Sequence, residues 1–273
     1  MNLSTLQSVG NVERYENNVE KELIKCAHNL TNARAAYATV DKQMLTVIKF
    51  ATTLSFRREP VLITGATGTG KELIARIVHG ANKGDLVPVN TTAVTDTLFE
   101  SELFGHMKGS FTGAFKDREG LVHHTGEGTL FLDEIGDMPV ELQAKILRLI
   151  QFGTYRSVGD NKTQKAACRI IAATCKPLQE LIRNKLFRED LYYRLSTFKL
   201  HLTPLKDRRH DAELYVTNHP MWASMDRNAR DSFLTYVHNE PLDGNYRELE
   251  QVMLRYEVLE ELPTQKHLVE KKF

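Results

Sequence analysis

The amino-acid sequence predicts an α/β protein in which a parallel sheet is flanked by helices and is followed by a smaller all-helical lid. Short apolar runs rich in β-branched residues predict buried strands at residues 59–65, 86–90, 128–134 and 168–175. Helical spacing of apolar residues is found at residues 44–57, 71–80 and 138–151. Strands that alternate with helices form a parallel sheet with helices on its faces, which gives a three-layer core.

The character of the sequence changes after about Pro204, where apolar runs give way to helical patterns with loops between them. We therefore expect four segments. They are a helical leader at residues 1–35, an α/β core at 36–204, a helical lid at 205–263 and a tail at 264–273. The leader has helix-like spacing but no catalytic pattern, and the tail is expected to fray.

The composition is that of an ordinary soluble protein and excludes several classes of function. The 273 residues include 36 Lys and Arg against 35 Asp and Glu, so no basic excess supports bulk nucleic-acid affinity. No apolar run is long enough to span a membrane, and the first residues carry no apolar signal segment. Cys26, Cys168 and Cys175 are too few and too scattered for a disulfide framework or a zinc site. We expect reduced thiols in a cytoplasmic protein.

The stretch GATGTGKE at residues 65–72 matches the phosphate-binding pattern G-x-x-x-x-G-K-[ST] at Gly65, Gly70 and Lys71. Glu72 departs from it, because the pattern has a hydroxyl there that reaches magnesium. The stretch follows a predicted strand and opens a predicted helix, so its N–H groups and Lys71 would face phosphate oxygens. An incidental lysine in a Gly/Thr-rich turn is the alternative. The order of strand, loop, lysine and helix favours a P-loop NTPase.

Two acidic residues, Asp133 and Glu134, follow the apolar strand TLFL. Carboxylates at the end of a buried strand are costly unless they have a function. In a P-loop NTPase the first acid holds magnesium and the second polarises a water molecule for attack on the terminal phosphate. Solvated acids in a strand-end turn are the alternative, and the upstream loop favours the functional interpretation. Asp133 also supplies a metal ligand that does not depend on Glu72.

The stretch GHMKGSFTGAFKD at residues 105–117 frames an aromatic residue, Phe111, and a hydroxyl, Thr112, with glycines. One interpretation is a mobile loop whose apolar tip contacts a partner. The other is a hairpin with Phe111 turned inward. Residue physics alone leaves both open.

Five motifs, in order, resemble those of the central AAA+ domain of bacterial enhancer-binding proteins, which activate the sigma-54 form of RNA polymerase. They are GATGTGKELIARIVHG, ESELFGHMKGSFTGAF, GTLFLDEIGDMPVELQAKILRLIQ, FREDLYYRL and GNYRELEQ. The resemblance spans about residues 36–253. In this family a glutamate follows the P-loop lysine, so Glu72 fits. The signature loop GAFTGA reads GSFTGA here, with Ser110 replacing the first alanine.

The resemblance implies ATP and Mg²⁺ as ligands and a role for each matched residue. The phosphates would be lined by Gly65, Ala66, Thr67, Gly68, Thr69, Gly70, Lys71 and Glu72. Asp133 would hold Mg²⁺, Glu134 would orient the water, and Asn90 would restrain Glu134 until the nucleotide state changes. Thr174 and Arg247 would sense the nucleotide within the same subunit. The sigma factor would be touched by Gly109, Ser110, Phe111, Thr112, Gly113 and Ala114.

Three arginines keep alternative interpretations. The resemblance implies that Arg188 and Arg194 complete the ATP site of a neighbouring subunit, and the sequence does not rank them. Taken alone, both could be surface ion-pair partners, and Arg247 with Glu248 could be an exposed helical pair. The ordered set of motifs favours the functional interpretation.

The sequence also departs from the family pattern. Cys175 replaces an asparagine that usually follows Thr174, and a thiol is a poor substitute for an amide, so hydrolysis is expected to weaken. The lid segment is shorter, and its turn reads PLDGN. After Met253 only about twenty residues remain, too few for the family's helix-turn-helix, so we expect no direct DNA binding from this chain.

These observations leave three hypotheses. The first is a ring-forming ATPase, a hexamer or a mixed ring with related activators, that moves its residue 105–114 loop against sigma-54 and so activates transcription initiation. The second is an ATPase of the same clade that acts on another macromolecule. The third is a hydrolysis-impaired modulator that assembles with full-length activators.

Overall fold

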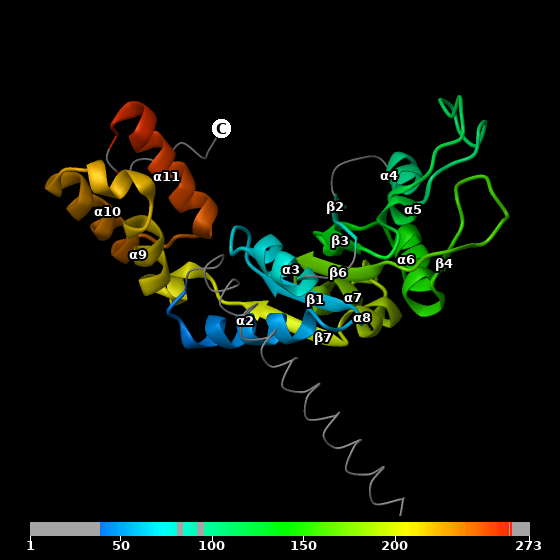
Figure 1. The fold of residues 1–273 in the computed structure, drawn as a ribbon, viewed down its shortest axis with the longest axis horizontal. Helices are drawn as coiled ribbons and strands as arrows, with labels where there is room; N and C mark the ends of the chain where they lie inside the picture. Colours follow the sequence, from blue (N-terminus) through cyan, green and yellow to red (C-terminus); the bar gives the residue numbers. More distant parts are fainter. Residues whose placement is uncertain (1–38, 81–83, 92–95, 262, 264–273) are drawn as a thin grey trace, which may run out of the picture.

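The computed structural model describes residues 39–80, 84–91, 96–261 and 263. These residues form an α/β core and an all-helical lid that extends from one end of the core (Figure 1). The predicted leader at residues 1–35, with Cys26, and the predicted tail at residues 264–273 lie outside the described residues.

Five parallel strands form the central sheet in the order β2-β3-β6-β1-β7. They are β1 (Val61–Gly65), β2 (Leu86–Asn90), β3 (Thr129–Asp133), β6 (Arg169–Thr174) and β7 (Phe198–Leu202). The four strands expected from apolar runs are confirmed. Sequence reasoning missed β7, an edge strand whose residues alternate between exposed and buried and therefore form no apolar run. A short hairpin, β4 (Thr154–Tyr155) with β5 (Gln164–Lys165), stands outside the sheet.

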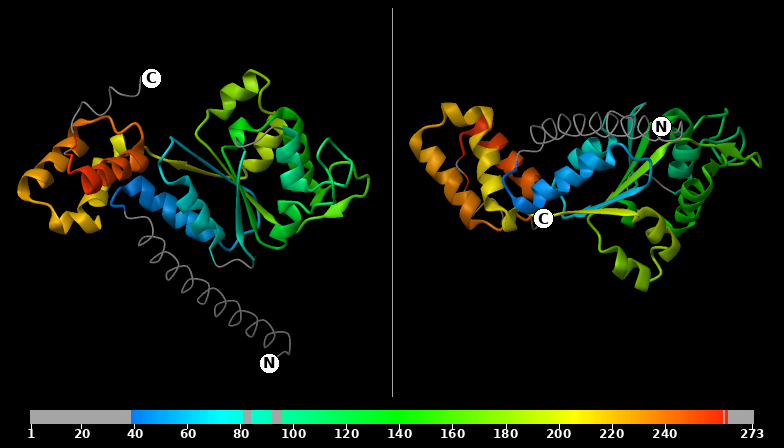
Figure 2. Two further views of the ribbon diagram at one scale, coloured as in Figure 1. Left: turned by 90° about the horizontal axis from the view of Figure 1, so that it is seen from above. Right: turned by 60° about the horizontal axis from the view of Figure 1, so that its bottom comes forward.

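Helices cover both faces of the sheet (Figure 2). They are α2 (Lys42–Leu54), α3 (Lys71–His79), α4 (Asp96–Phe104), α5 (Leu121–Thr125), α6 (Val140–Phe152), α7 (Leu178–Arg183) and α8 (Glu189–Leu195). The Asp41 side chain caps α2 by accepting a hydrogen bond from the Met44 N–H at 2.8 Å. Helix α6 follows Pro139 and ends at Gly153, whose positive φ of 61° suits glycine. The expected α/β fold class is therefore confirmed.

Alternation along the strands creates two apolar cores, one on each face of the sheet. Leu62, Leu130 and Ile170 face the core that includes side chains of α4 to α8. Val61 and Ile171 face the opposite core, which includes side chains of α2 and α3. Because the central strands β1, β3 and β6 are buried on both faces, their sequences are nearly continuous apolar runs.

The lid is a small helical unit with its own apolar core. Its helices are α9 (Arg209–Thr217), α10 (Arg227–Asn239) and α11 (Asn245–Leu259). The 3-10 turn η2 (Leu205–Asp207) precedes α9, and η3 (Pro220–Ser224) lies between α9 and α10. Phe233, Val237 and Leu249 are among the side chains buried between them. Figure 1 shows the three helices grouped beyond the end of the sheet that lies near α2 and α3.

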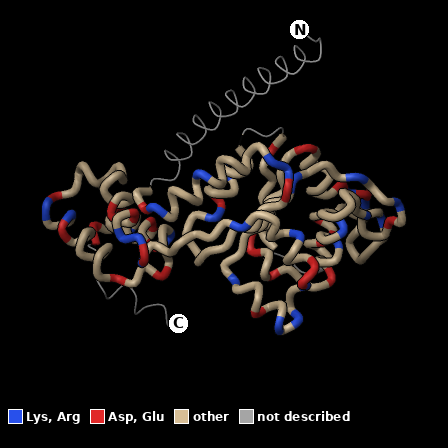
Figure 3. Tube along the Cα trace, turned by 90° about the horizontal axis from the view of Figure 1, so that it is seen from below, with Lys and Arg blue, Asp and Glu red and all other residues tan. Residues whose placement is uncertain are grey.

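Charged residues of both signs are interspersed over the core and the lid (Figure 3). Within the part of the chain that the structure describes, this view shows Lys and Arg mixed with Asp and Glu along the trace. Among the helices of the described residues, none has the length and apolarity that a membrane span requires.

Candidate nucleotide-binding site

The carboxyl ends of three neighbouring strands bring the predicted nucleotide residues together. Strand β6 lies between β1 and β3, with Ala172 paired to Leu62 on one side and to Leu132 on the other. The ends of these strands, Gly65 and Asp133 among them, therefore meet at one edge of the sheet. Ligands of open parallel sheets bind at this edge.

The loop between β1 and α3 has the strand–loop–helix form expected of a phosphate cradle. Gly68 and Gly70 adopt φ values of 76° and 94°, which side chains with a Cβ rarely adopt. The Thr69 hydroxyl donates to the Ala66 carbonyl at 2.8 Å, and Thr69 is fully buried. This internal bond closes the loop below the helix N-terminus, where N–H groups have no partner within the helix.

Lys71 directs its ammonium into the loop and toward the second acidic residue. Its Nζ lies 3.1 Å from the Gly65 carbonyl oxygen, 3.3 Å from that of Ala66 and 3.5 Å from Glu134 Oε1. The lysine side chain is only 7% exposed. A buried ammonium with these acceptors is held at the mouth of the loop, where an incoming phosphate would compete for it.

Glu134 is fixed by contacts from three segments. Its backbone is left-handed, with φ of 54°, and its carbonyl accepts a hydrogen bond from the Thr91 hydroxyl at 2.6 Å. Its carboxylate faces Lys71 and accepts a bond from the backbone N–H of Cys175 at 2.9 Å. A strained backbone held by several partners is typical of functional residues.

The contact from Cys175 bears on the expected weakening of hydrolysis. The main-chain N–H of Cys175 donates the hydrogen bond to Glu134, and any residue except proline supplies such a donor. The thiol itself is exposed. Thr174 is buried, and its hydroxyl accepts a bond from the Lys176 N–H at 3.0 Å. The thiol therefore takes no part in the bond that reaches Glu134.

Asp133 is the residue best suited to hold a metal ion. Burial raises the pKa of its carboxyl, the neighbouring Glu134 raises it further, and Lys71 and Arg247 act in the opposite direction. A divalent cation would relieve the repulsion between the two acids, and hard carboxylate oxygens suit Mg²⁺. In the described part of the chain, no three His, Cys, Asp or Glu residues gather as a metal cluster.

Glu72 and Asn90 lie beside the site. The Glu72 carboxylate is exposed and bonds Arg76 one turn further along α3 at 2.6 Å. Asn90 ends β2 and is the register partner of Asp133. The restraint of Glu134 by Asn90 therefore stays a prediction, supported by their placement at the same sheet edge.

The lid contacts the phosphate loop directly, through Asn245 and Tyr246, which the sequence did not single out. The Asn245 amide donates to the Thr67 carbonyl at 2.9 Å, and the Tyr246 N–H donates to the Gly68 carbonyl at 3.0 Å. A Cβ on Gly68 would lie 2.2 Å from the Gly244 oxygen, so only glycine fits there. The two residues that make these bonds belong to the GNYRELEQ motif. The sequence alone does not show that this motif contacts a loop 178 residues earlier.

Arg247 lies on the loop side of this contact. A Cβ built on Gly68 would sit 3.4 Å from the Arg247 Cβ, and the Arg247 charge lowers the pKa of Asp133. Glu248 is buried and accepts bonds from the Tyr236 hydroxyl and the Gly244 N–H, both at 2.7 Å. The interpretation of Arg247 and Glu248 as an exposed helical pair is therefore wrong.

The two candidate intersubunit arginines differ in their surroundings. Arg188 precedes α8 and forms two hydrogen bonds to Asp190, at 3.0 and 2.7 Å. This ion pair and its hydrogen bonds raise the pKa of Arg188. Arg194 is exposed in the last turn of α8, and within the described residues its guanidinium has no side-chain partner. The structure therefore separates two residues that the sequence could not rank.

In the loop at residues 105–114, the ring of Phe111 is turned inward and the residues that follow it are largely exposed. The Phe111 ring is half-buried and packs edge-on against His106, with ring centroids 5.0 Å apart. Ala114 is buried, and its N–H donates to the Phe111 carbonyl at 3.0 Å. Thr112 and Gly113 are exposed, and Phe115, just beyond, is 85% exposed. The apolar tip exists, but Phe115 rather than Phe111 forms it.

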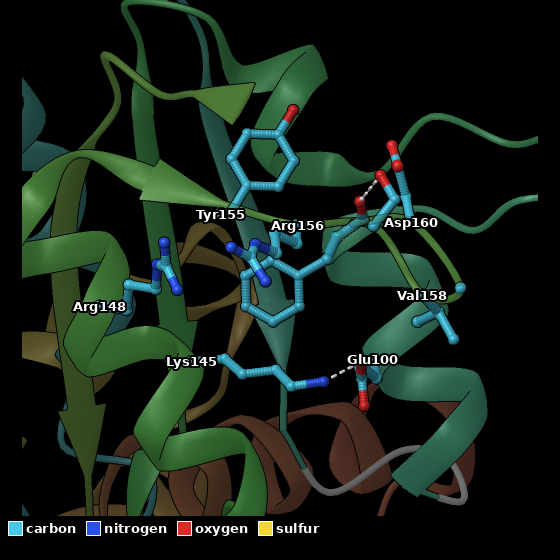
Figure 4. Close-up of a pocket in the computed structure, with 10 residues that line it drawn as sticks. Glu100, Lys145, Arg148, Tyr155, Arg156, Val158 and Asp160 are labelled. Atoms are coloured by element: carbon cyan, nitrogen blue, oxygen red, sulfur yellow. Dashed lines mark hydrogen bonds and ion pairs between the residues drawn. The ribbon is translucent and has the colours of Figure 1, made fainter. Parts of the chain in front are cut away.

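A pocket of about 380 Å³ lies behind this loop, between α4, α6 and β4 (Figure 4). Lys145 and Glu100 form an ion pair at its edge, and the Tyr155 ring is among its lining side chains. Val158, also in its wall, accepts a hydrogen bond from the Met107 N–H at 3.0 Å. The wall of the pocket thus supports the base of the predicted partner loop.

A second pocket, of about 440 Å³, adjoins the phosphate loop itself. Gly65 and Ala66 line it on one side, and Thr174 and Cys175 line it on another. His201 of the edge strand also borders it, 3.0 Å from the Thr64 hydroxyl. The sheet edge is therefore accessible beside the Lys71–Glu134 pair.

Comparison with known proteins identifies the family to which the chain belongs. The family model of the sigma-54 interaction domain matches residues 37–201. The regulatory protein AtoC of Escherichia coli is 42% identical over 245 residues, covering 86% of this chain and 51% of that protein. The DNA-binding transcriptional regulator NtrC of Azospirillum brasilense is 44% identical over 211 residues, covering 73% of this chain and 43% of that protein.

A solved structure extends the comparison to the fold. The crystal structure of NtrX from Brucella abortus in complex with ATP superposes with a TM-score of 0.70 at 25% identity, covering 95% of this chain and 57% of that chain. The chain spans about half the length of the curated relatives it matches. The loop motif, the acidic strand end, the fold and the family match agree, and the chain belongs to the family of sigma-54 interaction domains, which have the AAA+ fold.

Proposed function

We propose that this chain is the ATP-hydrolysing module of a sigma-54-dependent transcriptional regulator. The observation that carries the proposal is the meeting of Lys71, Asp133 and Glu134 at one sheet edge, under a lid that bonds the phosphate loop. A metal-assisted hydrolysis site requires a cation for the phosphates, a carboxylate for the metal ion and a second carboxylate for the water, and these three residues supply them.

Each group has a chemical role that its position supports. The loop N–H groups and Lys71 would bind the phosphates, and Lys71 would exchange its carbonyl partners for phosphate oxygens. Asp133 would hold Mg²⁺, which supplies charge neutralisation at the phosphates. Glu134, freed from Lys71 by this exchange, would orient the attacking water and accept its proton. Arg247 would add a positive charge from the lid side.

Arg194 is proposed as the residue that completes the site of a neighbouring subunit. Its guanidinium is exposed and unpaired within the described residues, whereas Arg188 is committed to Asp190. Transition-state arginines of this kind raise phosphoryl-transfer rates by about 10³–10⁵-fold. The assignment requires a ring of subunits, which we propose to be a hexamer.

Contact with sigma-54 is assigned to the exposed part of the residue 105–114 loop. Thr112 is exposed, and the loop base is bonded to residues around the pocket of Figure 4. A rigid base with an exposed tip suits a loop that moves with the nucleotide state and contacts a partner.

The direct test combines hydrolysis and partner binding. Purified protein should hydrolyse ATP, and Glu134→Gln should reduce the rate at least about 100-fold while nucleotide binding is retained. With ADP and aluminium fluoride, the wild-type chain should bind purified sigma-54 in a gel-filtration assay. Hydrolysis without sigma-54 binding would favour an ATPase that acts on another macromolecule.

Thr112→Ala tests the role of the loop separately from hydrolysis. It should abolish sigma-54 binding and leave the ATPase rate within about twofold of the wild type, because Thr112 is exposed and absent from the nucleotide site. Loss of both properties would contradict the assignment of the loop.

Cys175 provides the test of the hydrolysis-impaired alternative. Because the bond to Glu134 comes from the main chain, we propose that Cys175→Asn changes the ATPase rate less than about tenfold. A basal rate that is undetectable in the wild type and appears in Cys175→Asn would identify the chain as an impaired modulator.

A further inference from the structure

Asp211, near the start of α9, is a buried carboxylate that collects contacts from distant parts of the chain. It forms an ion pair with Arg208 at 2.8 Å, and both side chains are almost completely buried. It also accepts hydrogen bonds from the Thr39 hydroxyl at 2.5 Å, the Val40 N–H at 2.8 Å and the Asp41 N–H at 3.3 Å. The lid thereby holds the segment that leads into α2, 170 residues earlier.

Arg208 extends these contacts to α11. Its guanidinium lies over the Tyr246 ring, 5.2 Å from the centroid, and bonds the Tyr246 hydroxyl at 3.0 Å. It also donates to the Thr203 carbonyl at 2.8 Å, where the chain passes from β7 into the lid. The ion pair therefore fixes the linker and two lid helices in one arrangement.

Tyr246 connects this cluster to the phosphate loop. Its backbone N–H donates to the Gly68 carbonyl at 3.0 Å. The preceding residue, Asn245, donates to the Thr67 carbonyl and accepts from the Leu205 N–H at 2.7 Å. Tyr246 therefore contacts Arg208 through its ring and the loop that would bind phosphate through its backbone N–H.

The chemistry of the cluster makes it act as a unit. A buried ion pair is costly to break by removing one partner, because the other charge then remains buried and unpaired. Each of the contacts just described shares a partner with another, so their energies are coupled. Apolar packing of the lid alone would not require the buried Asp211 carboxylate to accept hydrogen bonds from three donors at residues 39–41.

We infer that Asp211 is a positioning residue for nucleotide binding, and that it couples the segment at residues 39–41 to the lid residues on the phosphate loop. The inference rests on the proposed function, that this loop binds ATP. Release of the segment from Asp211 would loosen Arg208 and Tyr246 and weaken the hold of Asn245 and Tyr246 on the loop. By linkage, nucleotide binding would tighten the hold of Asp211 on residues 39–41.

The experiment measures nucleotide affinity and amide exchange in the full chain. The dissociation constant of a fluorescent ATP analogue is compared for the wild type, Thr39→Val and Asp211→Asn. Thr39→Val removes one bond to Asp211 from a partly exposed residue, and we expect a Kd about threefold higher. Asp211→Asn leaves Arg208 without its counter-charge, and we expect the Kd to rise tenfold or more. Each tenfold rise corresponds to a loss of about 1.4 kcal/mol in binding free energy.

Thr46→Val is the matched control. Thr46 is an exposed threonine of α2 whose hydroxyl bonds the Lys42 carbonyl at 2.9 Å and does not touch the cluster. Its Kd should equal that of the wild type. If Asp211→Asn fails to fold, the comparison of Thr39→Val with Thr46→Val still decides the question.

Hydrogen exchange separates positioning from a merely structural role. Nucleotide should slow exchange of the Val40 and Tyr246 amides together in the wild type, and Thr39→Val should reduce that protection at Tyr246. Equal Kd values for Thr39→Val and Thr46→Val, or unchanged Val40 exchange on nucleotide binding, would overturn the inference while leaving ATP binding intact. A wild-type chain that binds no nucleotide would overturn the proposed function as well.

Discussion

At the scale of single residues, the candidate site is a balance of like and unlike charges. Asp133 and Glu134 are adjacent acids, and Lys71 approaches Glu134 at 3.5 Å. Burial and the charge of Glu134 hold the pKa of Asp133 above its usual value. The proposed Mg²⁺ would offset this repulsion between the two acids, which costs stability while no cation is bound.

The raised pKa of Asp133 predicts a gain of stability on its neutralisation. The folded chain binds this proton more tightly than the unfolded chain, so between the two pKa values stability falls as the pH rises. At neutral pH, Asp133→Asn should unfold at a higher temperature than the wild type and lose Mg²⁺-dependent hydrolysis. Near the ordinary aspartate pKa of about 3.9 the difference in melting temperature should shrink. A lower melting temperature for the variant at neutral pH would contradict this account.

Ser110 is a second residue with an uncompensated polar group. In the described residues its hydroxyl is buried and has no hydrogen-bond partner. Removing a buried unsatisfied hydroxyl is favourable by about 1–3 kcal/mol, so Ser110→Ala should raise the free energy of unfolding. Urea denaturation of both proteins measures the change, and an equal or lower midpoint for Ser110→Ala would argue against it.

Phe115 predicts a separation of partner binding from hydrolysis. Its ring is 85% exposed, and a solvent-facing aromatic ring beside Thr112 suits a binding anchor. Phe115→Ser should weaken sigma-54 binding about tenfold or more, with an unchanged ATPase rate. Phe152→Ser, which changes a phenylalanine 70% exposed at the end of α6, is the control and should bind sigma-54 normally.

At the scale of elements, a buried arginine joins the ends of the two helices that cover one face of the sheet. Arg169 begins β6 and is 1% exposed. Its guanidinium donates to the Leu54 carbonyl at the end of α2 and to the Val78 carbonyl near the end of α3, at 3.0 and 2.8 Å. Burial lowers its pKa to about 10, which still leaves it charged at neutral pH. A cation is favourable beside the carbonyls at helix ends.

Replacing Arg169 should therefore destabilise the core. Arg169→Met leaves two buried carbonyls without these donors, and we expect a loss of about 3 kcal/mol in the free energy of unfolding. Arg58→Met is the control, because Arg58 also bonds two carbonyls but is exposed, and its loss should be below about 1 kcal/mol. Equal midpoints in guanidinium chloride for the two variants would refute the role assigned to Arg169.

At the scale of the whole molecule, the exposed Arg194 predicts that active sites are shared between subunits. Arg194→Ala and Glu134→Gln should each be inactive. In a random ring mixed one to one, about one quarter of the interfaces would pair an intact Glu134 with an intact Arg194. The mixture should recover about a quarter of the wild-type ATPase rate. A mixture as inactive as its two parents would place Arg194 outside the site.

Features of the site that lie within a few residues of one another could be predicted from the sequence, and contacts that depend on side-chain geometry or on distant residues could not. The fold class, the phosphate loop and the acidic strand end were predicted because each is a local pattern of a few residues. Strand β7 was missed because an exposed edge interrupts its apolar run. The inward packing of Phe111 and the pairing of Arg188 with Asp190 depend on side-chain geometry that a motif does not encode.

The sequence by itself determined that this chain is a P-loop protein of the sigma-54 interaction family, because loop glycines, Lys71 and the two acids stand in a recognisable order. Only the tertiary structure decided that Asn245 and Tyr246 of the lid bond the loop, and that Asp211 bonds Thr39 from 172 residues away. The physical reason is that local patterns follow from backbone geometry and burial. Contacts between distant segments depend instead on how the packed elements bring their polar groups together.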